Sequence, residues 1–348
     1  MSQMVFQKAK WYERDERFLF AHHHTALLMD LMLARDVNAH KLLKGTGLFY
    51  EDILTGHSKI APEQLILLIE ISEAISTDKD VSFRWGSNLW PGHYGEFSQL
   101  LNSASNLREA LKYLSQYRKQ LCPLLAPKIV NDERYCYVLW QDTVGLDTQS
   151  QFMVEAYMSG LSSMVNWLSN QNYPWRYCFN YDRPQHDAEY EVNLGPNLHF
   201  SLGINGMIIE NSYLDKPWKN HTSHSAKRVL EQNCERSIDY PIAGFIESVS
   251  EYLMANIRTQ ISLDQTANAF SMSSATFKRK LKKHKWSFQK LQDQARLEVS
   301  LYLFHVKGWT NDQVADYLNF NDLTNFRRAF KRWSGITPSD SRAMFSLT

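Results

Sequence analysis

One pattern of hydrophobic and polar positions occurs twice near the end of the chain. The first copy covers residues 264–281 and the second covers residues 311–330. In each copy a small alanine precedes an apolar residue, a short turn and two apolar residues that lie four positions apart. The matching positions are Ala267 and Ala315, Phe270 and Leu318, Phe277 and Phe326, and Leu281 and Phe330. This spacing predicts two closely packed helices per copy, which is a helix-turn-helix unit.

The second helix of each predicted unit has an outward face that ends in arginine and lysine. In the first copy this face carries Ser274, Ala275, Lys278, Arg279 and Lys282. In the second copy it carries Leu323, Thr324, Arg327, Arg328 and Lys331. Such a face suits insertion into a major groove, where arginine forks onto guanine and lysine neutralises phosphate. A solvated helical bundle would also carry charges, but the repetition of both core and basic face favours DNA binding.

The first residues of these second helices are also predictable. Ser273 stands at the start in the first copy, and Asn321 or Asp322 stands there in the second. Side chains of these types accept a hydrogen bond from a free backbone N–H of the first helical turn. We therefore expect them to be the N-caps.

A long helix is predicted between the two units. Residues 287–306 place apolar side chains on one stripe with helical spacing. The stripe consists of Phe288, Leu291, Ala295, Val299, Tyr302, Leu303 and Val306. Twenty residues at a rise of about 1.5 Å span about 30 Å, close to the roughly 34 Å between successive major-groove faces of B-DNA. One chain is therefore expected to read two neighbouring turns.

The first 220 residues mix helical and strand patterns. Helices are predicted over residues 23–34, 62–75, 106–120 and 152–168, with Asn106 as the cap of the third. Strands are predicted over residues 135–141 and 175–181, with edge strands at 189–192 and 206–210. At 348 residues the chain exceeds what one core normally holds. The predicted fold is an α+β domain followed by an all-α domain with two helix-turn-helix units joined by a long helix.

Charge is divided unevenly along the chain. The formal net charge is only +1, yet residues 241–348 hold 15 Lys and Arg against 9 Asp and Glu. Residues 1–240 hold 23 against 28, and six of the eight residues from 278 to 285 are basic. The basic part is the one with the repeated pattern, which supports nucleic-acid binding by that part.

A polar stretch in the sequence suggests where the domains end. Residues 220–239 are polar, so we expect a ligand-sensing and dimerisation domain over 1–220, a linker over 221–240 and a DNA-binding domain over 241–348. A helix over residues 242–257 should open the last domain.

The cysteines are scattered: Cys122, Cys136, Cys178 and Cys234. Without a signal peptide or a long apolar run, this indicates a reduced cytoplasmic protein with no membrane partner.

The segment from about Ile261 to Phe345 resembles the DNA-binding domain of the AraC/XylS family of bacterial transcription regulators. The closest match to that family's signature is residues 326–339, and residues 276–281, 287–289 and 296–298 match its first half. There are two departures: Lys285 stands where the family usually has glycine, and Ser341 stands where an aromatic residue commonly precedes Arg342. Because glycine tolerates the left-handed conformation that ends many helices, Lys285 predicts a strained or altered turn.

The N-terminal part resembles the "arabinose-binding" type of sensor domain found in one branch of the same family. The similarity lies in residues 89–95, 106–114 and 196–200. It implies a small-molecule effector, without implying that the effector is arabinose. Candidate ligand contacts are Arg84, His93, Tyr94 and Tyr137.

Several residue patterns could suggest other chemistry. Tryptophans 85, 90, 140, 167 and 175 could line a ligand cavity, although packing in the core is the simpler expectation. His22, His23 and His24 are consecutive, so on a helix they point in different directions and do not suit a metal. No Ser/His/Asp, Cys/His or paired-carboxylate arrangement stands out. We therefore expect no catalytic residue, no metal and no cofactor.

Two hypotheses about function stay open at this point. The first is a regulator that binds double-stranded promoter DNA as a homodimer under the control of a small-molecule effector, and that contacts RNA polymerase if it is an activator. In this hypothesis the acidic sensor holds the basic recognition helices until ligand shifts the equilibrium. The second is an enzyme-like domain tethered to DNA, or a sensor that responds to a protein partner.

Dimerisation is assigned to the sensor part. The helix over residues 152–168 offers more apolar and small surface than one core face requires, at Phe152, Ala156, Ser159, Ser163 and Val165. The alternative is that this helix is simply buried.

Overall fold

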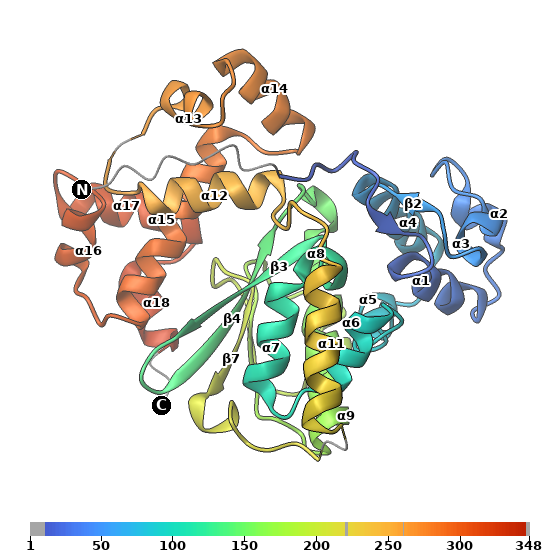
Figure 1. Ribbon diagram of the computed structural model, residues 1–348. Coiled ribbons are helices and arrows are strands. Elements are labelled where there is room, and N and C mark those ends of the chain that lie inside the picture. The colour runs from blue at the N-terminus through green and yellow to red at the C-terminus, as the bar shows by residue number, and fades with distance from the viewer. Residues whose placement is uncertain (1–10, 220–221, 260, 346–348) are drawn as a thin grey trace.

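The computed structural model describes residues 11–219, 222–259 and 261–345, in two parts that pack against each other (Figure 1). A part with both helices and strands comes first, and a wholly helical part follows. The predicted fold class, an α+β domain before an all-α domain with two helix-turn-helix units, is confirmed.

A five-stranded sheet forms the centre of the N-terminal part, with strand order β3-β4-β7-β5-β6. Its strands are β3 (Leu125–Asn131), β4 (Tyr135–Asp142), β5 (Arg176–Cys178), β6 (Leu198–His199) and β7 (Gly206–Glu210). Strands β5 and β6 are parallel, whereas the other neighbouring pairs are antiparallel. The strands predicted over 135–141 and 206–210 are present, and the one predicted over 175–181 is shorter. A separate pair joins β1 (Leu19–Phe20) to β2 (Lys59–Ile60).

The two faces of this sheet contact different neighbours, as β4 illustrates. Cys136, Val138 and Trp140 belong to the core of the N-terminal part. Tyr135 and Leu139 alternate with them and pack against a cluster that includes residues of the C-terminal part. Successive side chains of a strand point to opposite faces, so the sheet separates the two parts and contacts both.

Helices cover the inner face of the sheet and extend beyond it. They are α1 (His24–Leu33), α2 (Ala39–Leu43), α3 (Tyr50–Leu54), α4 (Pro62–Ile75), α5 (Val81–Ser87), α6 (Glu96–Asn102), α7 (Leu107–Gln116), α8 (Arg118–Leu121), α9 (Ser150–Ser169), α10 (Asp187–Leu194), α11 (His224–Arg236) and the 3₁₀ turns η1 (Asp147–Gln149) and η2 (Asn211–Tyr213). The helix predicted over 62–75 is α4. The one predicted over 106–120 divides into α7 and α8, and Asn106 caps α7 by accepting the Glu109 N–H at 2.9 Å.

Helix α9 runs through the middle of the N-terminal core, which overturns one prediction. Phe152, Ala156 and Ser159 are each exposed by 2 % or less. Helix α5 lies against α9 so closely that a Cβ on Gly86 would stand 2.1 Å from the Ala156 carbonyl oxygen. The dimerisation surface predicted on residues 152–168 is therefore wrong, because the sheet and α5 already cover the apolar faces of this helix.

The edge strand predicted over residues 189–192 is also wrong, because this segment lies within α10. Asp187 and Glu189 stand in the first turn of α10, where carboxylates interact favourably with the helix dipole. Gly195 ends the helix with a φ of 90°, a conformation that glycine adopts without strain. These end signals outweigh a short apolar alternation.

Helix α11 lies inside the stretch predicted as a linker. It packs along α6 and α7 (Figure 1). Lys227 pairs with Glu109, and the Tyr113 hydroxyl donates to Glu231 at 2.9 Å. Residues 222–236 are therefore attached to the N-terminal part, while the domain limits at 220 and 240 stay a prediction.

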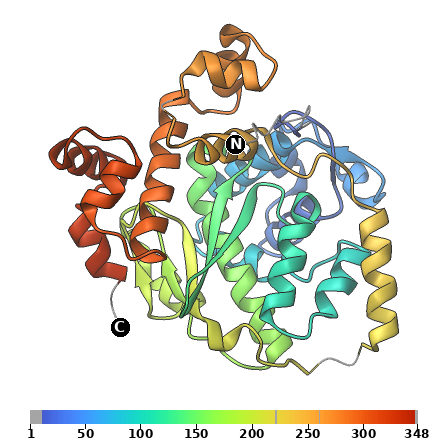
Figure 2. The same cartoon turned by 60° about the vertical axis from the view of Figure 1, so that its left-hand side comes forward.

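The C-terminal part consists of seven helices in the described ranges. They are α12 (Phe245–Ala255), α13 (Leu263–Ala269), α14 (Ser274–Lys283), α15 (Phe288–His305), α16 (Asn311–Tyr317), α17 (Leu323–Ser334) and α18 (Pro338–Phe345). Figure 2 shows α15 running from one helix-turn-helix unit to the other, beside the sheet. Throughout the described ranges, no helix has both the length and the apolar character that crossing a bilayer requires.

Candidate nucleic-acid interface

The first helix-turn-helix unit is α13 and α14, packed on α12. Phe277 and Leu281 of α14 are buried together with Phe245 of α12. Ala267 of α13 is fully buried, so its small side chain lets the two helices of the unit approach. Ser273 caps α14 by accepting the Thr276 N–H at 3.2 Å, as predicted.

The second unit is α16 and α17, packed on the C-terminal half of α15. Phe326 and Phe330 of α17 are fully buried and contact Phe304 of α15, with ring centroids 6.2 and 5.7 Å apart. Asp322, one of the two caps considered, accepts the Asn325 N–H at 2.7 Å. The two units therefore repeat one construction, with α15 between them.

The turns of both units need left-handed backbone. Ser271 and Asn319, which follow the first helix of each unit, have φ values of 57° and 58°. Lys285 follows α14 with a φ of 60°, so the left-handed turn that glycine usually makes is formed here by lysine. The Trp286 N–H then donates to the Leu281 carbonyl at 3.0 Å, which closes the end of the helix.

The cations predicted to face DNA are exposed and carry no counter-charge. Lys278, Arg279, Lys282, Arg327, Arg328 and Lys331 are all exposed. As far as the structure describes the chain, none of them forms an ion pair, whereas their neighbours on the same helices do. Lys280 and Lys283 pair with Glu13, and Arg332 pairs with Asp293. Protein carboxylates thus neutralise the basic residues off the predicted DNA face and leave those on it available for phosphate and base edges.

The remaining predicted DNA contacts stand at the starts of the two recognition helices. Ala275 and Thr324 are exposed, and Ser274 and Leu323 are half-buried. The Ser274 hydroxyl donates to the Asp264 carboxylate of α13, so this side chain also joins the two helices of its unit.

The connecting helix matches its prediction in length. Helix α15 has 18 residues and spans about 27 Å. Its buried set is wider than the predicted stripe, because Leu297, Leu301 and Phe304 are also buried while Tyr302 is 39 % exposed. The helix contacts the sheet on one side and the second unit on another, so one apolar stripe is not sufficient.

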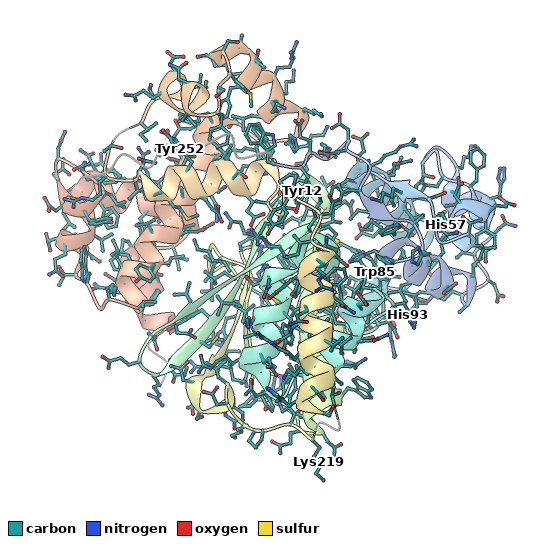
Figure 3. The ribbon with its side chains drawn as sticks, viewed as in Figure 1. Tyr12, His57, Trp85, His93, Lys219 and Tyr252 are labelled. Atoms are coloured by element: carbon teal, nitrogen blue, oxygen red, sulfur yellow. The ribbon has the colours of Figure 1, made fainter. Side chains whose placement is uncertain are left out.

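The first residues of the described chain connect the first unit to the N-terminal part. Tyr12 lies where the two parts meet (Figure 3) and forms backbone hydrogen bonds with Ala243 and Phe245, at 3.1 and 3.0 Å. Next to it, the Glu13 carboxylate pairs with Lys280 and Lys283 of α14. Burial opposes ionisation of Glu13, but the two ammonium groups prevail and lower its pKa to about 2.

A loop of the N-terminal part contacts the end of α14 from the other side. The buried ring of His284 donates from Nδ1 to the Val144 carbonyl at 2.8 Å, and burial lowers its pKa to about 4, so the ring is neutral at pH 7. The Trp286 indole donates to the Asp142 carboxylate at 3.0 Å. A Cβ on Gly145 would stand 1.8 Å from the His284 carbonyl oxygen. We call the residues 142–146 the junction loop.

The second unit contacts the N-terminal part through apolar side chains instead. Ile204 and Ile208 belong to one buried cluster with Leu301 of α15 and Phe326 of α17. A cavity of about 240 Å³ lies between this face of the sheet and α15. Lys128 and Glu298, which are 3.4 Å apart, stand in its wall.

The four predicted ligand contacts do not come together in one site. Arg84 is exposed on α5 and pairs with Asp80, and His93 is exposed nearby. Tyr94 is buried against the rings of His23 and His24. Tyr137 lies on the other side of the sheet, in the wall of the cavity beside α15, and donates to Asp132 at 2.7 Å. Of the five tryptophans, four are buried and Trp167 is exposed.

Both parts of the chain match models of known families. Residues 37–218 match the arabinose-binding domain of AraC transcription regulators, and residues 266–344 match a helix-turn-helix domain. The chain belongs to the AraC family of transcription regulators. The resemblance noted in the sequence is thereby confirmed, and the protein is an AraC-family regulator with a helix-turn-helix DNA-binding part and a ligand-binding type of N-terminal part.

Relatives of this AraC-family chain are themselves regulators. The Ornithine utilization regulator of Pseudomonas aeruginosa is 23% identical over 319 residues, which cover 90% of this chain and 94% of that protein. The HTH-type transcriptional regulator VqsM of the same organism is 30% identical over 121 residues, or 35% of this chain and 37% of that one. Among solved structures, the transcriptional regulator CdpR from Pseudomonas aeruginosa gives a TM-score of 0.44 at 15% identity, covering 94% of this chain and 100% of that one.

The sequence analysis expected the acidic N-terminal part to hold the basic recognition helices, but it did not predict the individual contacts. Glu13 and Asp15 lie in a segment of mixed charge, and Lys280 and Lys283 lie in the basic run. Nothing in the sequence indicates that the junction loop meets His284.

Proposed function

We propose that this AraC-family regulator reads promoter DNA with α14 and α17, and that a small molecule bound in the N-terminal part controls the reading. Arg279, Arg327 and Arg328 are assigned to base edges, and Lys282 and Lys331 to phosphates. The observation that carries this assignment is the contrast in ion pairing along the two helices. Basic side chains on the predicted DNA face have no carboxylate partner among the described residues, whereas Lys280, Lys283 and Arg332 have one.

Effector control acts through the position of the first unit in this proposal. Its helix α14 is attached to the sensor part by Glu13 on one side and by the junction loop on the other. A ligand that binds one arrangement of these contacts better than another shifts the population of DNA-competent molecules. The sensor over residues 1–220 and the DNA-binding part over 241–348 are the units that this coupling connects.

The DNA-bound form is proposed to be a homodimer, because two chains on adjacent sites combine their binding energies. The surface for pairing lies away from α9, which is buried. If the protein activates transcription, RNA polymerase is a further partner. The full-length relative is named for ornithine utilization, which places basic amino acids among the effectors to test first.

Selection of DNA from a randomised pool by the full-length chain tests the proposal. We expect enrichment of a motif with two blocks of conserved bases about 10 base pairs apart, one for each recognition helix. A chain with both Arg327→Ala and Arg328→Ala should lose the block read by α17 and keep the other. Uniform enrichment by the unmodified chain would contradict sequence-specific reading.

A further inference from the structure

A buried carboxylate stands in the middle of the sensor core. Glu155 is the one charged residue of α9, whose remaining positions are apolar or neutral. It is 4% exposed and accepts hydrogen bonds from the hydroxyls of Ser82, at 2.5 Å, and Tyr190, and from the Gln151 amide at 3.0 Å. These neutral donors solvate the carboxylate without neutralising its charge.

Burial of a charge is costly unless an opposite charge lies close. Within the described ranges, the one group that could supply a positive charge to Glu155 is the His186 ring, whose Nε2 lies 4.0 Å from Oε1 of Glu155. No lysine or arginine pairs with Glu155 there. The apolar helix thus retains a carboxylate whose charge the protein itself leaves largely unmatched.

Glu155 lines a cavity of about 220 Å³ between α4, α5, α9 and α10. The other lining residues are Glu73, Asp78, Lys79, Val81, Ser82, Thr148, Gln151, Phe152 and His186. Glu73 stands at the open rim, where desolvation and the Glu155 charge raise its pKa to about 7. Asp78 is already paired with Arg35 at 3.4 Å. Glu73 and Glu155 therefore share the cavity, and within the described ranges neither forms an ion pair with a lysine or arginine.

A second observation concerns a buried polar atom next to the cavity. Gln149 follows the lining residue Thr148, is 93% buried and lies close enough to Glu73 to influence its pKa. Its Oε1 atom has no hydrogen-bond partner in the described part of the chain. A buried oxygen without a donor is destabilising, and an N–H group entering beside Glu73 would satisfy it.

The side chains that line the cavity do not suit a metal ion. Within the described ranges, no group of three or more His, Cys, Asp or Glu side chains is placed to hold one. An organic cation, by contrast, needs a carboxylate, neutral acceptors and an apolar wall, and Phe152 and Val81 supply that wall.

We propose that this cavity binds the cationic amine of a small basic amino acid or diamine, with Glu155 and Glu73 as the recognition carboxylates. The proposal rests on effector control as proposed above and names the site and class of that effector. The volume of 220 Å³ is below the roughly 300–1,000 Å³ of sites for drug-sized ligands, which fits a small metabolite. Lys79 stands at the same wall and is the group that would receive the carboxylate of an amino acid.

The cavity is joined to the first helix-turn-helix unit by a short stretch of chain. Thr148 lines the cavity, and the turn η1 that contains it follows the junction loop directly. Three backbone N–H groups of that loop, from Val144 to Leu146, donate to Asp142, so the loop is rigid and transmits a shift of its end. The same loop contacts His284 and Trp286.

Calorimetry and thermal melting of the full-length chain test the site with three probes. L-ornithine has two ammonium groups and a carboxylate, putrescine has the ammonium groups alone, and L-norvaline has an uncharged side chain on the same amino-acid frame. We expect L-ornithine to bind and to raise the melting temperature, and L-norvaline to do neither. If putrescine binds as tightly as L-ornithine, recognition depends on Glu73 and Glu155 alone. If putrescine binds more weakly, Lys79 also contributes by binding the carboxylate of L-ornithine.

Variants locate the binding on the proposed carboxylates. Glu73→Gln removes the ionisable carboxyl at the rim, which a bound ammonium group would hold in its charged form. We expect about tenfold weaker binding of L-ornithine because that charged hydrogen bond is lost. Glu70→Gln, three residues earlier on α4 and outside the cavity, is the matched control and should bind as the unmodified chain does. Glu155→Gln should abolish binding. If Glu155→Gln does not fold, Glu73→Gln still tests the site.

The outcome separates this site from the proposed regulatory function. If neither L-ornithine nor putrescine binds, or if L-norvaline binds equally well, the cavity assignment is overturned. Selection of a DNA motif by the same preparation would then still support sequence-specific reading, whereas loss of the motif would overturn that function independently.

Discussion

The two helix-turn-helix units share one architecture and differ in how each is attached to the N-terminal part. The first is held mainly by charged and polar contacts, among them Glu13 with Lys280 and Asp142 with Trp286, beside one ring contact of Trp11 with Phe270. The second shares an apolar cluster with the outer face of the sheet, through Ile204 and Phe326.

This difference indicates which unit can be released. Charged contacts weaken with salt, with a change of protonation and with small displacements, whereas apolar contacts depend mainly on buried area. The first unit is therefore the one whose position a ligand can alter at low cost. The second unit is expected to stay with the sheet and α15.

The largest effect is expected from Gly145→Ala, which disrupts the contact between the junction loop and the end of α14. The new Cβ would stand 1.8 Å from the His284 carbonyl oxygen, so the junction loop and α14 must separate. Gly195→Ala is the matched control, because its φ of 90° equals the 89° of Gly145 to within a degree and no atom lies within 4 Å. Both variants carry a backbone cost for a positive φ, roughly 1–3 kcal/mol.

Only Gly145→Ala adds a steric cost of roughly 1–3 kcal/mol. Thermal melting should therefore show a larger loss for this variant, and hydrogen exchange in α14 should become faster. Equal melting temperatures for the two variants would mean that the contact between the loop and His284 does not hold the first unit.

Arg328→Ala tests the proposed base contact of the second unit. Loss of a base contact should reduce affinity for the selected motif by roughly 1–3 kcal/mol and relax preference at one position. Arg332→Ala is the control on the same helix, because Arg332 pairs with Asp293. Fluorescence anisotropy on specific and random duplexes measures both. Equal losses of Arg328→Ala on the two duplexes would rule out base reading by Arg328.

Glu13→Gln tests the charged attachment, with an expected loss of about 1 kcal/mol at pH 7. The pKa of Glu13 is about 2 in the folded protein against an ordinary value of 4.5. Its stabilisation is therefore complete above about pH 4.5 and disappears as the pH falls toward 2. The difference in melting temperature between the unmodified chain and Glu13→Gln should shrink from pH 6 to pH 3.

Glu16→Gln is the control for that series. Glu16 lies three residues after Glu13 and has no ion pair in the described part of the chain, and its oxygen accepts only the Glu13 N–H, at 3.4 Å. Its effect should be small at every pH. A difference for Glu13→Gln that is independent of pH would show that the carboxylate charge is not what attaches α14.

The smallest effect is expected from Lys331→Ala, which removes a proposed phosphate contact. The slope of log K against log salt should become shallower by about 0.9, with little change in sequence preference. Lys216→Ala is the control, because Lys216 lies over the Tyr213 ring in the sensor part. An unchanged slope for Lys331→Ala would place Lys331 away from the DNA backbone.

Local patterns were sufficient to predict the helical part of the molecule. The spacing of Phe277 and Leu281, repeated at Phe326 and Phe330, predicts the recognition helices, and the helix ends follow from Ser273 and Asp322. Helical contacts are local in sequence, so periodicity and capping contain most of the information they need. The strand predicted over 189–192 failed because a short alternation competes poorly with end signals for a helix.

The sequence was sufficient to propose which cations face DNA, but it could not show which of them are free of ion pairs in the described part of the chain. Spacing alone places Lys278 and Lys280 on the same helix, two residues apart. Only the folded chain shows that Lys280 pairs with Glu13, 267 residues away in sequence, while Lys278 stays exposed.

Motifs and local spacing in the chain were enough to identify the family, the repeated helix-turn-helix units and the division of charge between the two parts. Only the folded chain shows that α9 is buried, that Glu155 and Glu73 share a cavity, and that the junction loop contacts His284. The physical reason is the range of the interactions. Helix periodicity and caps act over a few residues, whereas ion pairs, cavities and contacts between parts join residues that only the complete fold brings together.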